Sequence, residues 1–314
     1  MSTPASTVSI REVGLRDGLQ SISRTVPTEQ KLQWLREAFR AGSREIEVGS
    51  FVPPRLLPQL ADTAELVTFA KTLPGLCVSV LVPNLRGAER AIEARADVML
   101  LPLSASHAHS LANLRKTPDA VLDDIRSIVH ARDATRSACE VEVGISTAFG
   151  CTIQGAVAPE EVLRLVGAAL DAGVDRVGLA DTVGYADPAM VASLFRSAKR
   201  IAGDRLACGH FHDTRGLGLA NVYAAWQEGA TRFDATIGGI GGCPHAPGAS
   251  GNVATEDVAY LFTSMGVATG LDLDALLALR TRVAGWLHGE TLHGTLWRAG
   301  LPKTLSPPPP ARPA

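Results

Sequence analysis

The stretch PEEVLRLVGAALDAGVDRVGLADT, residues 159–182, contains the repeating unit from which the fold is predicted. Apolar side chains recur with helical spacing over residues 159–170, and Asp171-Ala172-Gly173 then supplies a glycine at which a helix ends. The short apolar run Arg176–Leu179 follows and is typical of a buried strand. Polar residues, Asp181 and Thr182, come directly after it. The stretch therefore predicts a helix, a turn and a strand that ends in candidate functional side chains.

The same unit recurs along the chain. Helical spacing over residues 28–39, with Thr28 as the expected cap, ends at Gly42, and residues 221–228 end at Gly229. At roughly 30 residues per unit, this alternation predicts an α/β protein, a (β/α)8 TIM barrel, rather than an open doubly wound sheet. No dinucleotide fingerprint is present, since Gly216-Leu217-Gly218 lacks the third glycine. Eight short runs are the expected strands: residues 8–10, 45–48, 77–82, 97–101, 140–143, 176–179, 206–210 and 232–236.

The chain continues beyond the eighth expected strand. Residues 252–265 and 273–287 predict two extra C-terminal helices, so residues 1–290 are assigned to one barrel domain. Residues 291–314 are assigned to a C-terminal extension. Its end contains the run Ser306-Pro307-Pro308-Pro309-Pro310, which predicts a disordered proline-rich tail.

Composition excludes several classes of partner. The 314 residues are 46% hydrophobic and 20% charged, and 30 basic side chains face 32 acidic ones, for a net charge of −2. A nucleic-acid binder would need a basic patch, and no basic block is present. No signal peptide and no apolar stretch of about 18 residues is found, so neither membrane association nor secretion is expected and a cytoplasmic location is predicted.

Two histidines indicate a metal site. His210 and His212 lie two residues apart where the seventh expected strand ends, so an extended, pleated backbone directs both imidazoles to one face. Closure of the barrel pairs strand 8 with strand 1, which would bring Asp17 and Asn252 to the same rim. These nitrogen and oxygen donors suit an octahedral Mg²⁺ or Mn²⁺, although Zn²⁺ fits the ligand types too. A pair of hydrogen-bonded core histidines is the alternative.

An arginine beside the expected metal ligand is a candidate catalytic group. Arg16 adjoins Asp17, and its cation would lie where an enolate oxygen develops if a carbon-carbon bond broke beside a thioester. Glu47, on the second expected strand, would orient Arg16. The alternatives are a surface arginine in a salt bridge and an ordinary strand carboxylate.

Other histidines and the cysteines are weighed separately. Residues 238–251 hold six glycines and two prolines around Cys243, which predicts a mobile lid displaying a thiol that acts as acid, base or nucleophile, unless it is idle. Cys151 is at most a pocket residue, and Cys77, Cys139 and Cys208 are expected in the core. His107 and His109 follow the fourth expected strand. A solvated loop is the favoured interpretation for them over a second metal site, and they could line the substrate.

Five segments together resemble the 3-hydroxy-3-methylglutaryl-CoA lyases, a family of metal-dependent TIM-barrel enzymes. The resemblance extends from about residue 8 to residue 290, and the glycine-rich segment is its most specific part. The segments are EVGLRDGLQ (residues 12–20), IEVGSF (46–51), LADTVG (179–184), HFHDT (210–214) and GIGGCP (239–244) followed by GASGNVATED (248–257).

The resemblance implies an activity and roles for residues. A divalent cation, Mg²⁺ or Mn²⁺, would be bound by Asp17, His210, His212 and Asn252. Retro-Claisen cleavage would give acetyl-CoA and acetoacetate as a step of leucine catabolism, and a homo-oligomer is expected. The catalytic set implied is Arg16, Asp17, Glu47, His210 and Cys243, with Glu12, Gln20, Asp181 and Thr182 in substrate-binding or supporting positions.

Departures from the family pattern leave the substrate open. Gly49 stands where the family usually has Thr, Ser21 where it has Asn, and His107 where it has Glu, while residues 146–152 replace a Cys-rich segment. These positions surround the expected acyl pocket. Citramalyl-CoA or another branched 3-hydroxyglutaryl-CoA is therefore an alternative substrate. An acetyl-CoA-dependent condensing synthase and a non-catalytic CoA- or metabolite-binding barrel are alternative functions.

Overall fold

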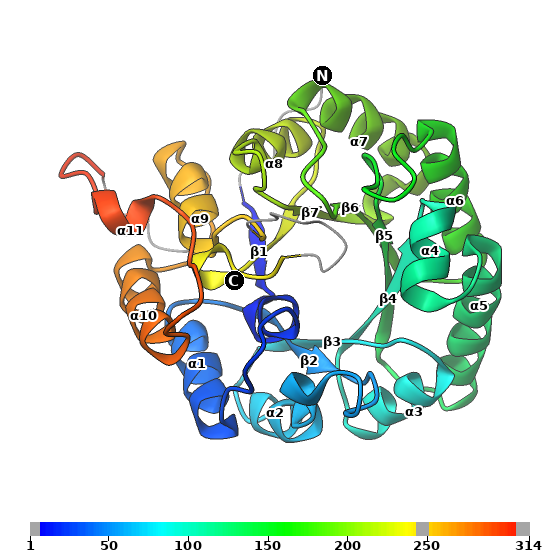
Figure 1. The fold of residues 1–314 in the computed structure, drawn as a ribbon, viewed down its shortest axis with the longest axis horizontal. Coiled ribbons are helices and arrows are strands. Elements are labelled where there is room, and N and C mark those ends of the chain that lie inside the picture. The colour runs from blue at the N-terminus through cyan, green and yellow to red at the C-terminus, as the bar shows by residue number, and fades with distance from the viewer. Residues whose placement is uncertain (1–6, 243–250, 306–314) are drawn as a thin grey trace.

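A closed barrel of parallel strands forms the centre of the molecule. The computed structural model describes residues 7–242 and 251–305, in which each strand pairs with the next and the last pairs with the first (Figure 1). This confirms the predicted (β/α)8 TIM barrel. The strands are β1 (Ser9–Glu12), β2 (Glu45–Ser50), β3 (Cys77–Leu81), β4 (Val98–Ser104), β5 (Glu140–Ser146), β6 (Arg176–Asp181), β7 (Leu206–Phe211) and β8 (Arg232–Ala235).

The barrel closes between its first strand, β1, and its last strand, β8. Arg11 on β1 pairs in register with Asp234 on β8, and Glu12 pairs with Ala235. Residues that follow β1 therefore lie beside residues that follow β8. Because the strands are parallel, their carboxyl ends all open on one end of the barrel, where active sites of this fold form.

Helices surround the strands (Figure 1). The predicted helix over residues 28–39 is present as α1, but Thr28 is not its cap. Pro27 occupies that position, and the Thr28 hydroxyl instead donates to Asp62 Oδ2 at 2.9 Å. The outer helices are α1 (Thr28–Arg40), α2 (Thr63–Ala70), α3 (Leu85–Glu93), α4 (His107–Leu114), α5 (Pro118–Ala134), α6 (Pro159–Asp171), α7 (Pro188–Ala202) and α8 (Gly218–Gln227).

Short helical turns occur at several connections. A π-helical turn follows β1 and a 3-10 turn follows β8, so both flank the line of barrel closure. Their bounds are η1 (Gly14–Gly18), η2 (Pro58–Leu60), η3 (Gly203–Arg205) and η4 (Ile237–Gly239).

The predicted extra helices are present as α9 (Thr255–Ser264) and α10 (Leu273–Trp286), and α11 (Leu296–Ala299) follows. Both termini of α9 lie inside the predicted range, since the helix begins three residues after Asn252. The described part of the extension packs on α9, because the Asp257 carboxylate accepts hydrogen bonds from the backbone of Thr295 and Leu296. The predicted proline-rich tail lies outside the described residues. The division at residue 290 stays a prediction.

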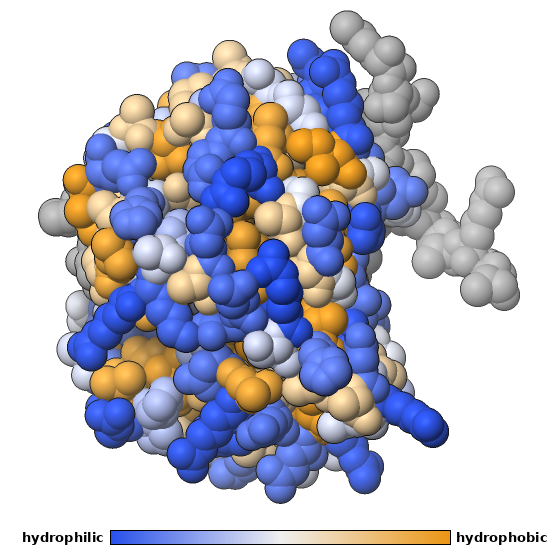
Figure 2. All heavy atoms as spheres, turned by 90° about the vertical axis from the view of Figure 1, so that its right-hand side faces the viewer, coloured by the Kyte–Doolittle hydropathy of each residue, from blue (hydrophilic) through white to orange (hydrophobic). Residues whose placement is uncertain are grey.

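Apolar side chains fill the space between the strands and the helix layer. Trp34, Phe195 and Phe262 are among the largest fully buried side chains. The outer face over α4, α5 and α6 mixes hydrophilic side chains with scattered apolar ones (Figure 2). Such a mixed surface is that of an amphipathic helix layer facing water. Within the described residues, no helix has the length and apolarity needed to cross a bilayer.

Candidate active site

A cavity of about 1330 Å³ opens at the carboxyl ends of the strands. Its lining includes Arg16, Asp17, His210 and His212, while the exposed Arg55 and Arg115 contribute cationic groups. Pockets for drug-sized ligands span about 300–1,000 Å³, so this cavity has room for a larger molecule. It is the concave site from which the chemistry must be derived.

Three predicted metal ligands converge in this cavity. The Nε2 atoms of His210 and His212 lie 3.2 Å apart, and Asp17 Oδ2 lies 4.0 Å and 3.9 Å from them, respectively. Ligand atoms of these residues all fall within 4.8 Å of one another. Two imidazole nitrogens that face each other beside a carboxylate are a donor set typical of a divalent-metal site. The strand β7 ends at Phe211, so His212 lies one residue past this strand, where it forms an isolated β-bridge with Asn252.

Asn252 completes the group of predicted ligands. Its Nδ2 donates to Asp17 Oδ2 at 2.6 Å and to the carbonyls of Ile240 and Gly241. Its Oδ1 is buried and has no hydrogen-bond partner among the described residues. An unsatisfied buried oxygen needs a partner, and a hard cation would supply one. The residues present therefore fit a divalent cation held by Asp17, His210, His212 and Asn252.

Protonation of His212 and Asp17 favours the same use of these two groups. Burial and the neighbouring His210 lower the pKa of His212 to about 3, so that this imidazole is neutral near pH 7. Burial opposes ionisation of Asp17, but Arg16 and the two histidines outweigh it and lower the pKa of this carboxyl group. Neutral imidazole and ionised carboxylate are the forms that bind metals.

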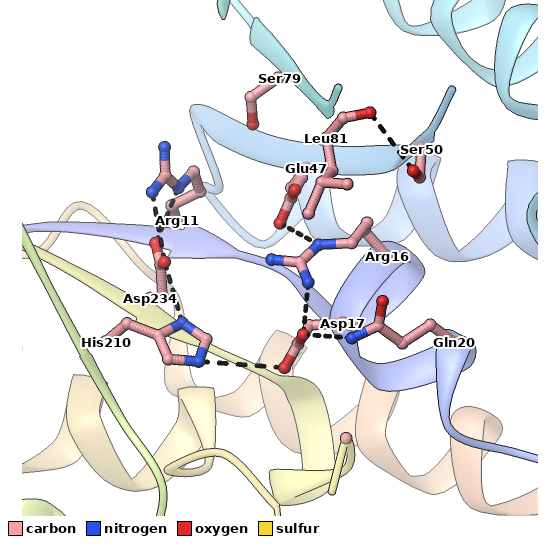
Figure 3. A network of polar contacts seen from close by, with 12 residues as sticks. Arg11, Arg16, Asp17, Gln20, Glu47, Ser50, Ser79, Leu81, His210 and Asp234 are labelled. Carbon is pink, nitrogen blue, oxygen red and sulfur yellow. Dashed lines mark hydrogen bonds and ion pairs between the residues drawn. The ribbon is translucent and has the colours of Figure 1, made fainter. Parts of the chain in front are cut away.

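Arg16 is fixed by two carboxylates at the edge of this group (Figure 3). Its Nε lies 2.7 Å from Glu47 Oε2, and its Nη1 donates to Asp17 Oδ1, to which Gln20 Nε2 also donates at 2.7 Å. Burial lowers the pKa of Arg16, but the neighbouring carboxylates of Glu47 and Asp17 outweigh this effect and raise the pKa above its ordinary value. The guanidinium is therefore charged. A planar cation that lines the cavity is thereby held beside the candidate metal ligands.

Glu12, one of the predicted supporting residues, accepts hydrogen bonds from backbone groups and from a hydroxyl group of other segments. Glu12 is buried and accepts hydrogen bonds from the N–H groups of Gly14 and Ile237 and, at 2.5 Å, from the Thr255 hydroxyl. Burial raises the pKa of Glu12 to about 7. Its hydrogen bonds join the segment after β1 to the segments around β8 and α9. Glu12 is not among the residues that line the cavity, so it supports these segments and does not contact a ligand.

Asp181 and Thr182 follow β6 as predicted, but they differ in position. Asp181 is 1% exposed, and its carboxylate accepts hydrogen bonds from the backbone of Tyr185 and Ala186, which fixes the loop after β6. Thr182 lines the cavity, and its hydroxyl accepts a hydrogen bond from Thr147 N. Asp181 is therefore placed to support the loop, and Thr182 to contact a ligand.

The second histidine pair lies in a helix, so the expected solvated loop is wrong. Ser106 caps α4 by accepting a hydrogen bond from the backbone N–H of His109, and the helix begins at His107. His107 is exposed. His109 is 3% exposed, lines the cavity and has its Nδ1 3.0 Å from Ser104 Oγ. The structure thus puts one of the two imidazoles on the cavity wall.

The cysteines divide differently from the sequence-based expectation. Cys139 is buried as predicted, and Cys151 is 1% exposed and does not line the cavity. Cys77 is only partly buried. Cys208 is buried, but it lies among charged groups, with its Sγ 3.2 Å from Asp234 Oδ1. Cys243 and residues 244–250 of the expected lid lie outside the described residues.

Sequence reasoning missed a buried ion pair that contacts His210. Arg11 and Asp234 are buried, and Asp234 Oδ2 lies 3.1 Å from His210 Nδ1 (Figure 3). The available signal was a charged residue inside each of two short strands, β1 and β8, that closure makes neighbours. Side chains of opposite charge at paired positions of buried strands indicate an ion pair.

Comparison with known proteins agrees with this geometry. The HMGL-like family model matches residues 7–283. The chain belongs to the HMGL-like family. This HMGL-like protein is 38% identical to the hydroxymethylglutaryl-CoA lyase of Bacillus subtilis over 272 residues, which cover 86% of this chain and 90% of that protein. It is also 38% identical, over 304 residues, to the (R)-citramalyl-CoA lyase of Chloroflexus aurantiacus, covering 93% and 95% of the two chains.

Solved structures show the same resemblance. The HMGL-like chain superposes on an HMG-CoA lyase of Acinetobacter baumannii, determined in complex with coenzyme A and 3-methylmalate, with a TM-score of 0.90. The two sequences are 39% identical, and the match covers 98% of this chain and 100% of the other. The whole described barrel therefore has the architecture of the family.

Proposed function

We propose that this HMGL-like protein is a metal-dependent acyl-CoA lyase that cleaves 3-hydroxy-3-methylglutaryl-CoA to acetyl-CoA and acetoacetate. The observation that carries the proposal is the group Asp17, His210, His212 and Asn252 beside the fixed cation of Arg16, in one large cavity. Relatives named hydroxymethylglutaryl-CoA lyase support the choice of reaction.

The metal ligands would be Asp17, His210, His212 and Asn252, the last through its unpartnered Oδ1. A bound Mg²⁺ or Mn²⁺ supplies Lewis-acid polarisation of substrate oxygens, which makes loss of a hydroxyl proton accessible near neutral pH. Gln20 holds Asp17 in place through its amide. These residues would position the 3-hydroxyl group for cleavage of the adjacent carbon-carbon bond.

Arg16 would stabilise the negative charge that develops when this bond breaks. The electron pair of the bond moves toward the thioester carbonyl and forms the enolate of acetyl-CoA. Glu47 and Asp17 fix the guanidinium before the reaction, so little reorganisation is needed as the charge develops. Glu47 thereby acts as a positioning group.

Two proton transfers complete the reaction. The substrate hydroxyl loses a proton as the ketone forms, and the enolate carbon gains one to give acetyl-CoA. Cys243 is the expected acid or base on the lid, as the family resemblance implies. His210, also in the expected catalytic set, would contribute as a metal ligand, because its Nε2 faces His212 and Asp17 while its Nδ1 faces Asp234. Thr182 would contact the substrate from the wall after β6.

The size and charge of the cavity suit a CoA thioester. Its volume of about 1330 Å³ leaves space beyond the metal ligands. The exposed arginines Arg55 and Arg115 line it and would attract phosphate groups. A CoA-bound relative with a TM-score of 0.90 supports this choice of ligand.

Citramalyl-CoA is the second candidate substrate. The relative from Chloroflexus aurantiacus that is named for this activity matches 93% of the chain at 38% identity, as high as the identity to the Bacillus subtilis enzyme. His109 adds an imidazole to the cavity wall. Citramalyl-CoA is one methylene group shorter than 3-hydroxy-3-methylglutaryl-CoA between the hydroxyl-bearing carbon and the carboxylate, so the position of a polar group on the wall would select between the two acyl chains.

A panel of 3-hydroxyacyl-CoA esters, supplied with Mg²⁺ or Mn²⁺, tests the proposal through release of acetyl-CoA. Acetoacetate as the second product supports 3-hydroxy-3-methylglutaryl-CoA, whereas pyruvate identifies citramalyl-CoA. Consumption of acetyl-CoA with a 2-oxoacid and release of free CoA would instead identify a condensing synthase. Binding of CoA esters without turnover would identify a non-catalytic barrel and refute the lyase proposal.

A further inference from the structure

The two imidazoles of the proposed metal site have different surroundings at Nδ1, the ring nitrogen that does not face the other histidine. His210 Nδ1 lies 3.1 Å from the carboxylate of Asp234. His212 Nδ1 is buried and has no hydrogen-bond partner among the residues that the structure describes. One histidine is therefore held at both ring nitrogens, and the other only at the nitrogen that faces the site.

Asp234 is itself held by several donors (Figure 3). Arg11 donates through Nε to Asp234 Oδ1 at 2.7 Å and through Nη2 to Oδ2 at 3.2 Å. Cys208 Sγ donates to Oδ1 at 3.2 Å, and Glu142 accepts from Arg11 Nη2 at 2.8 Å. All four side chains are at most 6% exposed, so this arrangement is part of the barrel interior rather than a surface ion pair.

This arrangement determines which ring nitrogen of His210 carries the proton. An ionised carboxylate only accepts hydrogen bonds, so a neutral ring must place its proton on Nδ1 to satisfy Asp234. Nε2 then keeps its lone pair toward His212 and Asp17. A lone pair at Nε2 is what metal binding requires, and carboxylate partners fix metal-binding histidines in this way in many proteins.

We infer that Asp234, oriented by Arg11, is a positioning residue that fixes His210 with its proton on Nδ1 and its Nε2 directed to the metal. This inference rests on the metal site of the proposed function, but it concerns only the binding of the ion. It adds Arg11 and Asp234 to the residues on which the site depends.

The variant Asp234→Asn tests the inference because its shape is conserved while its hydrogen bonding is not. Arg11 Nε and Cys208 Sγ both donate to the Oδ1 position, at 2.7 Å and 3.2 Å, whereas the Arg11 contact with Oδ2, through Nη2, is longer than that of Nε, at 3.2 Å. We therefore expect the amide oxygen at the Oδ1 position and the NH2 group at the Oδ2 position. The NH2 group then faces His210 Nδ1, which becomes an acceptor. The ring proton moves to Nε2 and blocks the nitrogen that faces the metal.

The matched control is Glu142→Gln. It replaces another buried carboxylate that Arg11 contacts, but it leaves the Asp234–His210 contact in place. Titration of each metal-free protein with Mn²⁺, followed by electron paramagnetic resonance, measures affinity without any substrate. We expect Asp234→Asn to weaken Mn²⁺ binding by about 10- to 100-fold and Glu142→Gln to change it by less than about threefold.

Nitrogen NMR of ¹⁵N-histidine-labelled wild-type protein, free of metal and at mildly alkaline pH, reads the ring proton of His210 directly and needs no folded variant. A proton on Nδ1 in the wild type is expected, and a shift to Nε2 in Asp234→Asn. A wild-type proton on Nε2, or equal Mn²⁺ affinity in a folded Asp234→Asn protein, would overturn the inference. A protein that binds Mn²⁺ as described but cleaves no acyl-CoA would refute the proposed reaction and leave this inference intact.

Discussion

Two pairs of histidines with the same spacing have different fates in this molecule. His210 and His212 lie at the end of β7, where a spacing of two directs both rings to one side, and their Nε2 atoms lie 3.2 Å apart. His107 and His109 begin α4, where a spacing of two separates side chains by about 200°. One of that pair lines the cavity and the other is exposed. A histidine spacing therefore indicates a metal site only together with the secondary structure that carries it.

The largest expected effect comes from removal of a ligand in the first pair. Because His212 supplies one of the four proposed donors, His212→Ala should weaken Mn²⁺ binding strongly and lower kcat by about 10³-fold or more, the loss of metal activation. Chelation of the wild type should cause the same loss, and added Mn²⁺ should reverse it. Metal titration and acetyl-CoA release measure the two effects. Wild-type metal content with full turnover in His212→Ala would reject the ligand assignment.

Arg16→Lys should have the next largest effect on turnover. Lysine keeps the charge but loses the planar donors that contact both Glu47 and Asp17. We expect kcat to fall by about 10²- to 10³-fold, as after loss of a preorganised donor to an oxyanion, with Mn²⁺ affinity nearly unchanged. Steady-state kinetics and metal titration separate these effects. An unchanged kcat would remove Arg16 from the catalytic set.

His109→Ala should have a smaller effect, which concerns substrate binding and not metal binding. The imidazole lines the cavity without belonging to the metal group, so its loss should raise KM or alter the choice of acyl chain by about 2- to 10-fold, the range of one hydrogen bond. Kinetics on two or more acyl-CoA esters measure this change. Loss of Mn²⁺ binding in this variant would mean that the two histidine pairs are not independent.

His107→Ala should have the smallest effect and is the matched control for the other histidine variants. The side chain is exposed on α4, and exposed substitutions usually change stability by less than about 0.5 kcal/mol. Turnover, Mn²⁺ affinity and melting temperature should match the wild type. A marked fall in kcat would show that His107 contacts the substrate and would make both members of this pair functional.

Much of this arrangement was predictable from sequence because the barrel rule is topological. Eight strand and helix units predict closure, and closure brings Asp17 and Asn252 together although 235 positions separate them. The orientation of Arg16 by Glu47 also follows, since Arg16 comes directly after β1 and Glu47 lies on the neighbouring strand β2.

Other parts were not predictable because they depend on local geometry. The sequence favours a loop at His107 and His109, because a serine before them does not by itself identify a helix cap, whereas in the structure Ser106 caps α4. Threonine often caps helices, but the Thr28 hydroxyl donates its hydrogen bond to Asp62 and does not cap α1. The contact between Asp234 and His210 depends on the depth of each side chain within the barrel, and strand spacing alone does not specify that depth.

The most direct test of the central claim is anomalous scattering from a crystal of the protein grown with Mn²⁺. The account predicts one strong anomalous peak within coordination distance of Asp17, His210, His212 and Asn252, lost in His212→Ala and kept in His107→Ala. A peak elsewhere, or none at a saturating Mn²⁺ concentration, would contradict the proposal that residues from both ends of the chain hold one divalent cation.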